Sequence, residues 1–246
     1  MDQRKWARLA LLASSCVFLM AAVSGCGSQA GTQASSSSQT DTGSQSTAGS
    51  QSTTGSQSTA GSQTTPSANE ENLYTPKYVL NGKEVVVIKT TKGTITAKLY
   101  EKDAPIASAN FVELALKGFY NGIKFHRYVA GFVVQAGDPG TKAASAAAVA
   151  AADANQTNEF GAGGPGYSIK DEFASNPNKH VDGTLAMART QAPNSGGSQF
   201  YFSLAVWPGG DNQYTVFGQA TSGLDVIHKL RAGDEIKSIT VENASK

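Results

Sequence analysis

The chain has 246 residues, with 20 Lys and Arg against 19 Asp and Glu, so its formal net charge is only +1. Because positive and negative charges balance, there is no excess of positive charge to bind nucleic acid, and we expect no nucleic-acid partner. The only cysteines are Cys16 and Cys26. Cys16 lies inside an N-terminal apolar run, and Cys26 lies just after that run. A folded domain further along the chain therefore has no disulfide, thiolate nucleophile or cysteine metal site.

The first 25 residues have the pattern of an export signal. Arg4, Lys5 and Arg8 precede an apolar run from Leu9 to Val23, and small residues follow. A run of this length is typical of a secretory signal and short for a membrane span. Val-Ser-Gly-Cys26 resembles a bacterial lipobox, which implies cleavage at residue 25, diacylation of Cys26 and an extracytoplasmic, membrane-anchored protein. The alternative is an ordinary signal peptide that happens to contain a cysteine.

Residues 26–72 predict a tether that begins at the lipidated Cys26. The segment consists mostly of Ser, Gln, Thr and Gly, with a six-residue repeat from Gly43 to Thr65. The segment has no large apolar side chain and therefore cannot bury a core, so we expect disorder. Its r.m.s. span is on the order of 35–40 Å, enough to hold a domain away from a membrane surface. The folded domain is predicted over residues 73–246.

Short strands and two helices are predicted along this domain. Residues 94–100 alternate strictly, which places Ile95, Ala97 and Leu99 on one buried face. A helix begins at Asp103-Ala104-Pro105 and ends at Lys117-Gly118, with its buried stripe at Ala107, Phe111, Leu114 and Ala115. Further strands are expected at 85–88, 185–188, 199–204, 214–218 and 239–241, with a second helix around 224–230. Many short strands with one helix near each end predict a closed antiparallel barrel.

The stretch from Lys124 to Asp138 is the most informative. It predicts two short strands, Phe125–Val129 and Phe132–Gln135, in which Arg127 shares a face with Phe125 and Val129. An arginine between apolar neighbours is unusual, because burying its charge is costly. It marks either a functional site or an edge strand whose arginine head is solvated.

Five ordered motifs between about residues 83 and 242 resemble the cyclophilin-type peptidyl-prolyl isomerases. They are Phe125 to Asp138, Gly161-Ala-Gly-Gly-Pro-Gly-Tyr167, Met187-Ala-Arg-Thr190, Asn194-Ser-Gly-Gly-Ser-Gln-Phe200 and Tyr214-Thr-Val-Phe-Gly218. The resemblance implies a mainly β fold, an eight-stranded antiparallel barrel capped by two helices. It also implies prolyl isomerisation of proline-containing peptides and unfolded exported proteins, by a domain that we expect to be monomeric.

Site residues follow from this resemblance by position. Arg127 matches the catalytic arginine, and Gln135 matches the glutamine that orients it and contacts the substrate backbone. Phe132 matches the floor of the proline pocket. Gln199 and the backbone of Ala188 and Arg189 match the groove for residues before the proline. The remaining substrate-binding candidates are Phe125, His126, Val133, Tyr201, Gly210 and Tyr214. Because isomerisation breaks no bond, no metal or cofactor is expected, and His126, His180 and His228 show no ligand spacing.

Two of these positions depart from the family pattern. Gly210 stands where the family usually has an apolar wall residue, and Tyr201 replaces a usual phenylalanine. A shallower or more polar pocket would follow, and Gly210→Leu is expected to tighten binding. The departure keeps a second function open, a non-catalytic proline-peptide binding chaperone. Trp207 is either a ligand clamp or a residue of a loop or core.

Residues 141–160 are an insertion that the family pattern does not explain. Ala143–Ala154 is nearly all alanine, with Val149 as its only large apolar side chain. We expect a frayed, partly helical arm held loosely on the barrel, because a helix of about 12 residues is marginal in water. Either the arm is a tolerated surface insertion without function, or it overhangs the substrate groove.

Overall fold

The structure is a computed structural model, and residues 72–243 are the part that it describes. The predicted signal peptide, Cys26 and all but the last residue of the predicted tether lie outside this range. Within residues 72–243, no helix combines the length and the apolar character that crossing a membrane requires.

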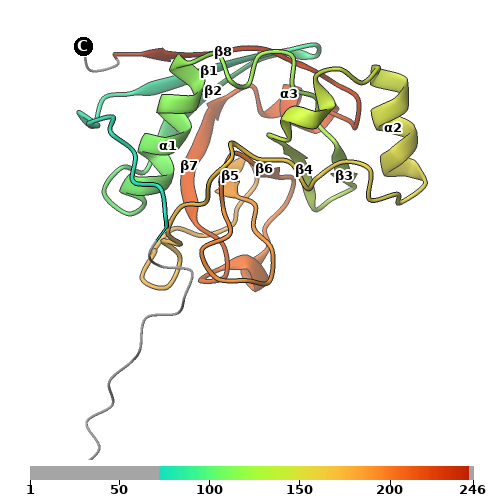
Figure 1. The fold of residues 1–246 in the computed structure, drawn as a ribbon. Helices are drawn as coiled ribbons and strands as arrows, with labels where there is room; N and C mark the ends of the chain where they lie inside the picture. The colour runs from blue at the N-terminus through green and yellow to red at the C-terminus, as the bar shows by residue number, and fades with distance from the viewer. Residues whose placement is uncertain (1–71, 244–246) are drawn as a thin grey trace, which may run out of the picture. The chain divides into compact units, whose positions relative to one another are not determined.

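In the described part of the chain, eight strands form one curled sheet in which every pair is antiparallel (Figure 1). Their spatial order is β3-β4-β6-β5-β7-β2-β1-β8. The bounds are β1 Val85–Thr90, β2 Gly93–Leu99, β3 Arg127–Val129, β4 Val133–Ala136, β5 Thr184–Met187, β6 Phe200–Ser203, β7 Val216–Ser222 and β8 Ile236–Glu242. Each of the strands predicted from the sequence is present, with bounds shifted by a few residues.

The sheet is open, so the prediction of a closed barrel is not confirmed. Its edge strands β3 and β8 do not pair with each other within the described range. Residues 122–125 and 233–236 join the two edges through an isolated bridge between Lys124 and Glu235 and four backbone hydrogen bonds, among them one from the Phe125 N–H to the Asp234 carbonyl at 2.8 Å. The residues just before β3 therefore pair with the residues around the start of β8. No continuous ladder of hydrogen bonds forms between β3 and β8 themselves.

The two faces of the sheet have different roles, because alternate side chains of a strand point to opposite faces. In β6, Phe200 and Phe202 are fully buried in the main core, whereas Tyr201 belongs to a smaller apolar cluster with Val133 and Val216. The main core supplies most of the buried apolar area. The smaller cluster underlies the candidate site.

Helices α1 and α3 pack against the sheet and complete the main core. Helix α1, Pro105–Leu116, lies against β7 and β8, and its predicted stripe is buried as expected. The Glu172 carboxylate accepts hydrogen bonds from the first N–H groups of α1, on Ile106 and Ala107, so this residue stabilises the start of the helix. Helix α3, Leu224–Lys229, packs against β2.

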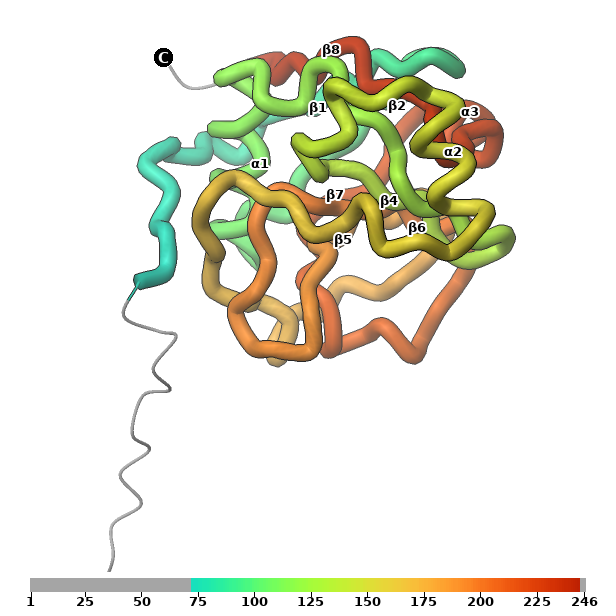
Figure 2. Tube along the Cα trace, turned by 45° about the vertical axis from the view of Figure 1, so that its right-hand side comes forward, coloured from blue at the N-terminus to red at the C-terminus, as the bar shows by residue number. Residues whose placement is uncertain are grey.

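The insertion is ordered, which corrects the prediction of a frayed arm. A 3₁₀ turn, Pro139–Thr141, is followed by helix α2, Ala146–Ala154, which the Ser145 hydroxyl caps by accepting from the Ala148 N–H at 3.1 Å. Val149 is fully buried although it is the only large apolar side chain. The helix lies beside α3 and the turn that follows it (Figures 1 and 2). Tertiary packing therefore stabilises a helix that would be marginal alone.

Candidate active site

A row of paired residues crosses four strands and positions the central side chains of the site. Arg127 of β3 lies opposite Gln135 of β4, Gln135 lies opposite Tyr201 of β6, and Tyr201 lies opposite Ala186 of β5. Directly opposed residues of antiparallel strands share a face. Val133, two residues before Gln135, shares it too, so these side chains gather on the side of the smaller apolar cluster.

Arg127 is exposed and has no carboxylate partner among the described residues. Its guanidinium carbon lies 5.8 Å from the centre of the Phe132 ring, a distance at which a cation and an aromatic face attract each other. Arg127 is therefore held beside an aromatic surface while its N–H donors remain available. The ion pairs that the described range contains all involve other basic residues.

A cavity of about 210 Å³ lies between Arg127 and the smaller apolar cluster, and we call it the Trp207 cavity. It brings together eight of the residues predicted from the sequence. The lining consists of Trp207 and of Arg127, Phe132, Val133, Gln135, Ala188, Arg189, Tyr201 and Tyr214. Trp207 lies in the wall of this cavity, where its ring is available to a ligand. Its ring meets that of Phe132 edge-on at 4.6 Å.

Gly210 leaves no gap in this wall, because the Trp207 ring occupies the space beside it. A Cβ added at Gly210 would lie 2.5 Å from Trp207 Cε3 and 3.0 Å from His180 Cε1. The expectation that the pocket lacks a wall at position 210 is therefore wrong. The Trp207 ring occupies the volume that a side chain at position 210 would otherwise fill. Gly210 is buried beneath that ring in the 3₁₀ turn Pro208–Gly210.

A hydrogen-bonded chain supports Tyr201 from behind the cavity. The Tyr201 hydroxyl lies 2.9 Å from His180 Nε2, and His180 Nδ1 lies 3.1 Å from an oxygen of Asp211. Burial lowers the pKa of His180, so the ring is neutral near pH 7, and burial raises the pKa of Tyr201. The hydroxyl that distinguishes Tyr201 from a phenylalanine is thus satisfied inside the protein.

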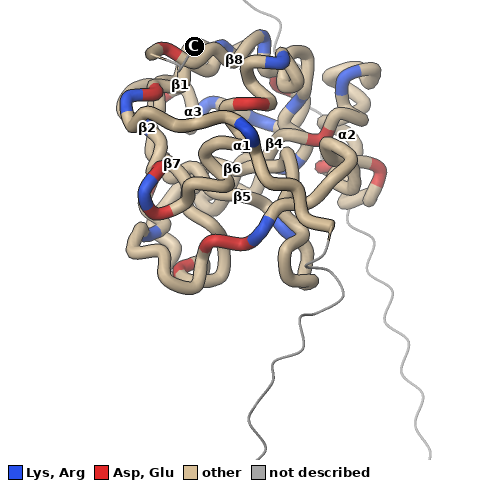
Figure 3. Tube along the Cα trace, turned by 60° about the vertical axis from the view of Figure 1, so that its left-hand side comes forward, with Lys and Arg blue, Asp and Glu red and all other residues tan. Residues whose placement is uncertain are grey.

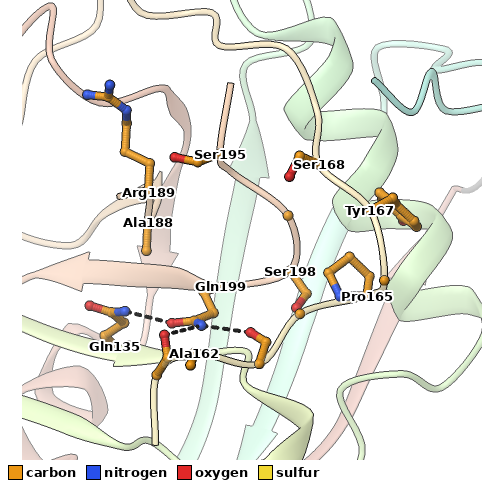
Figure 4. Close-up of a pocket in the computed structure, with 15 residues that line it drawn as sticks. Gln135, Ala162, Pro165, Tyr167, Ser168, Ala188, Arg189, Ser195, Ser198 and Gln199 are labelled. Carbon is orange, nitrogen blue, oxygen red and sulfur yellow. Dashed lines mark hydrogen bonds between the residues drawn. The ribbon is translucent and has the colours of Figure 1, made fainter. Parts of the chain in front are cut away.

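A second cavity, of about 420 Å³, continues from the first along the glycine-rich segment 161–168, and we call it the glycine-loop cavity. Gln135, Ala188 and Arg189 line both cavities. Gln135 Nε2 donates to Gln199 Oε1 at 2.9 Å, and Gln199 Nε2 donates to the carbonyls of Gly161 and Gly163 at 2.8 Å each (Figure 4). These bonds fix the Gln135 amide between the two cavities.

Besides Gly210, two further predicted site residues line neither of these two cavities. Phe125 is fully buried in the main core and lines neither cavity, because β3 begins only at Arg127 and the alternation does not extend back to Phe125. His126 is six per cent exposed and lines a third cavity on the other side of Arg127. Burial lowers its pKa, so the imidazole is neutral near pH 7.

Asp138 organises the site although the sequence did not single it out. Its carboxylate is three per cent exposed and accepts hydrogen bonds from the N–H groups of Gly140, Gly161 and Gly163 at 2.7, 2.6 and 3.2 Å. A Cβ at Gly163 would lie 2.1 Å from the carboxylate, so only glycine fits there. The sequence signal that could have identified Asp138 is the Gly137-Asp138 pair, which directly follows a strand.

Charges around the site are mixed in sign. Basic and acidic residues are interspersed along the traced chain in Figure 3. Residues 72–243 contain no group of three or more His, Cys, Asp or Glu side chains arranged to hold a metal ion. The site therefore offers a guanidinium, amides and aromatic surfaces as its chemical groups.

Comparison with known proteins identifies the family. Residues 85–245 match the model of the family described as cyclophilin type peptidyl-prolyl cis-trans isomerase/CLD. A Helicobacter pylori peptidyl-prolyl cis-trans isomerase is 45% identical over 160 residues, which cover 64% of this chain and 86% of the relative. Peptidyl-prolyl cis-trans isomerase B of Bacillus subtilis is 40% identical over 148 residues, covering 60% and 90%.

The fold agrees with this match. A Cryptosporidium parvum cyclophilin-type isomerase, whose crystal structure was determined in the presence of the dipeptide Ala-Pro, superposes with a TM-score of 0.53 at 26% identity. The similarity covers 65% of this chain and 99% of that protein. This chain therefore belongs to the family of cyclophilin-type peptidyl-prolyl cis-trans isomerases.

Proposed function

We propose that this chain isomerises X-Pro bonds of exported polypeptides and that Arg127 stabilises the transition state. The observation that carries the proposal is an exposed guanidinium without a carboxylate partner in the described range, beside an aromatic-walled cavity. An unpaired arginine retains its donors for a ligand, whereas an arginine in an ion pair would have them engaged.

The chemistry requires stabilisation of a twisted amide. The barrier to rotation about a peptide bond is about 18–20 kcal/mol, because the nitrogen lone pair is delocalised into the carbonyl. In the twisted state the prolyl nitrogen is pyramidal and accepts a hydrogen bond, which the planar ground state does not. A guanidinium near that nitrogen therefore stabilises the transition state selectively. Its charge is permanent, because a guanidinium does not lose its proton in proteins.

The cavities supply the binding groups. In the proposal the proline ring enters the Trp207 cavity and packs against the wall that Phe132 and Trp207 form, and the preceding residues lie along the glycine-loop cavity. Gln135 adjoins both cavities and is oriented by Gln199, so its amide is available to the substrate backbone. The glycine at position 210 was the feature that favoured a non-catalytic binding module. Because the Trp207 ring fills the space beside Gly210, this glycine no longer favours that alternative.

Substitution of Arg127 tests the catalytic role. Arg127→Ala is expected to lower kcat/KM for a proline tetrapeptide by one to three orders of magnitude, about 1.4–4 kcal/mol of transition-state stabilisation. Arg127→Lys is expected to be impaired as well, because a point charge does not reproduce the planar fork. Arg231→Ala is the control, since Arg231 contacts Tyr128 away from the Trp207 cavity. A folded Arg127→Ala protein with wild-type kcat/KM would refute the role.

The location is a second part of the proposal and depends on the sequence outside the described range. The lipobox-like segment ending at Cys26 supports a lipid anchor, and the Ser/Gln/Thr/Gly segment supports a tether that holds the enzyme clear of the membrane. The substrates would then be exported proteins that fold outside the membrane. Cys26→Ala is expected to abolish lipidation and release the protein from the membrane fraction or leave it unprocessed. Mature protein that stays membrane-bound with unchanged mobility would contradict the anchor.

A further inference from the structure

The insertion lines a third cavity, next to Arg127, which we call the insertion cavity. It measures about 280 Å³, and residues from the end of the insertion form one wall: Asp153, Gln156, Thr157, Asn158 and Phe160. The opposite wall consists of His126, Arg127, Val129 and Gln135. Arg127 and Gln135 also line the Trp207 cavity, so the insertion cavity opens on the same two side chains as the proposed reaction centre.

The wall from the insertion is held in place at several points. Val149 is fully buried and Ala152 is six per cent exposed, so α2 is packed against the rest of the protein. The turn after α3 approaches so closely that a Cβ at Gly233 would lie 2.4 Å from the Ala146 carbonyl oxygen. The Tyr128 N–H donates to Asp153 Oδ1 at 3.2 Å, which joins the end of α2 directly to β3.

The two ends of the insertion are also tied together. The Asp138 carboxylate accepts from the N–H of Gly140 at the start and from that of Gly161 just after the end. The buried Lys124 ammonium donates to the carbonyls of Thr141 and Lys142, both at 3.2 Å. A cavity wall fixed in this way loses little conformational entropy when a ligand binds.

The lining has the chemistry of a site for polar peptide groups. Asp153 contributes a carboxylate, Gln156 and Asn158 contribute amides, and Thr157 contributes a hydroxyl. Among the described residues only one carboxylate oxygen of Asp153 has a hydrogen-bond partner, the Tyr128 N–H, so the carboxylate can accept from a further donor. His126 also lines the cavity, and both ring nitrogens of this buried residue lack a hydrogen-bond partner among the described residues.

We propose that the insertion builds an additional substrate subsite that binds hydrogen-bond-donating side chains of an extended polypeptide, next to the prolyl bond held at Arg127. This inference rests on the proposed prolyl isomerase function. A tetrapeptide fills the Trp207 cavity and the adjoining part of the glycine-loop cavity, whereas a longer peptide also reaches the insertion cavity. The insertion therefore selects for extended chains that carry Lys, Asn or Gln near the proline.

The test compares two substrates on the full chain. One is a proline tetrapeptide, and the other is the same peptide extended at both ends by four residues that include Lys. Asn158→Ala and Asp153→Asn are expected to lower kcat/KM for the extended peptide by about three- to ten-fold, through KM, while the tetrapeptide value stays unchanged. Asp153→Asn retains an oxygen for the Tyr128 N–H. Replacing the Lys by Leu in the extensions is expected to cancel the effect of Asp153→Asn.

Glu159→Ala is the matched control, because Glu159 is the exposed neighbour of Asn158 and does not line the cavity. It is expected to change neither substrate's kinetics. The subsite is refuted if the ratio of the two kcat/KM values is the same in Asn158→Ala, Asp153→Asn and the wild type, or if both substrates lose activity equally. Failure of the proposed function is a different result, in which the wild type does not isomerise the tetrapeptide, and it refutes the subsite as well.

Discussion

The packing of Trp207 over Gly210 leads to a prediction that reverses the one from the sequence alone. A Cβ at Gly210 would lie 2.5 and 2.6 Å from two carbon atoms of the Trp207 ring, whereas carbon atoms in contact lie about 3.5–4.0 Å apart. Gly210→Leu therefore displaces the ring from the cavity wall. We expect the substitution to destabilise the fold by about 1–3 kcal/mol, as overpacking does, and to raise KM for proline peptides.

Trp207→Ala removes the same wall without overpacking. Full burial of a large apolar side chain contributes about 1.5–3 kcal/mol, and Trp207 is only partly buried, so we expect a loss of about 1–2 kcal/mol in transition-state binding. This corresponds to a decrease of about 5- to 30-fold in kcat/KM. Leucine at position 210 has room once the ring is absent. The double variant is therefore expected to recover part of the activity that each single variant loses.

The assay is a double-mutant cycle on kcat/KM for a proline tetrapeptide, with melting temperatures measured in parallel. Val206→Ala is the control, because the Val206 side chain precedes Trp207 and is 67% exposed. Sites that compete for one volume show a coupling energy of about 0.5–3 kcal/mol, whereas independent sites add. Additive losses, or a Gly210→Leu protein with wild-type stability and kcat/KM, would refute the argument that the ring replaces a side chain at position 210.

Three further predictions concern stability and pH. Val149→Ala should destabilise the protein by about 1.5–3 kcal/mol in chemical denaturation, because Val149 is fully buried, whereas a frayed arm would show no change. Burial lowers the pKa of His180, so the unfolded state binds more protons, and stability should fall as the pH drops below the ordinary value of 6.5. Tyr201→Phe should lower stability at neutral pH by removing the hydrogen bond to His180 but should keep this slope. Burial raises the pKa of Glu113, but hydrogen bonds from the Tyr74 hydroxyl and the Tyr78 N–H outweigh it, so the pKa is lowered. The resulting stability is complete above the ordinary carboxyl pKa and should disappear as the pH falls through the lowered value, and Glu113→Gln should flatten that acid limb of a melting-temperature profile.

Local patterns in the sequence determined the elements themselves. The alternation of Ile95, Ala97 and Leu99 placed β2 and its buried face, because a strand has a side-chain period of two. The spacing of Ala107, Phe111, Leu114 and Ala115 placed α1 and its core stripe in the same way. Both signals lie within one helix or one strand, so no distant contact is needed to interpret them.

The sequence predicted those site residues that match a family motif position by position. Arg127, Phe132, Gln135, Tyr201 and Tyr214 all line the Trp207 cavity, and their catalytic and substrate-binding roles stay predictions. Phe125 does not, because the side-chain alternation assumed for a five-residue strand stops where β3 begins. Strand ends depend on which segments pair, and the residues before β3 pair with a segment more than a hundred positions away.

Only the tertiary structure decided how the volumes between elements are filled. Trp207 replaces the side chain that Gly210 lacks, and Val149 becomes buried, because neighbours from other elements meet them there. No local period encodes such contacts. The same holds for the meeting of the three cavities at Gln135, which depends on its hydrogen bond to Gln199, 64 residues later. The sequence by itself thus determined the strands, the helices and the chemical groups of the site, whereas long-range packing decided that the sheet stays open and how the cavities are shaped.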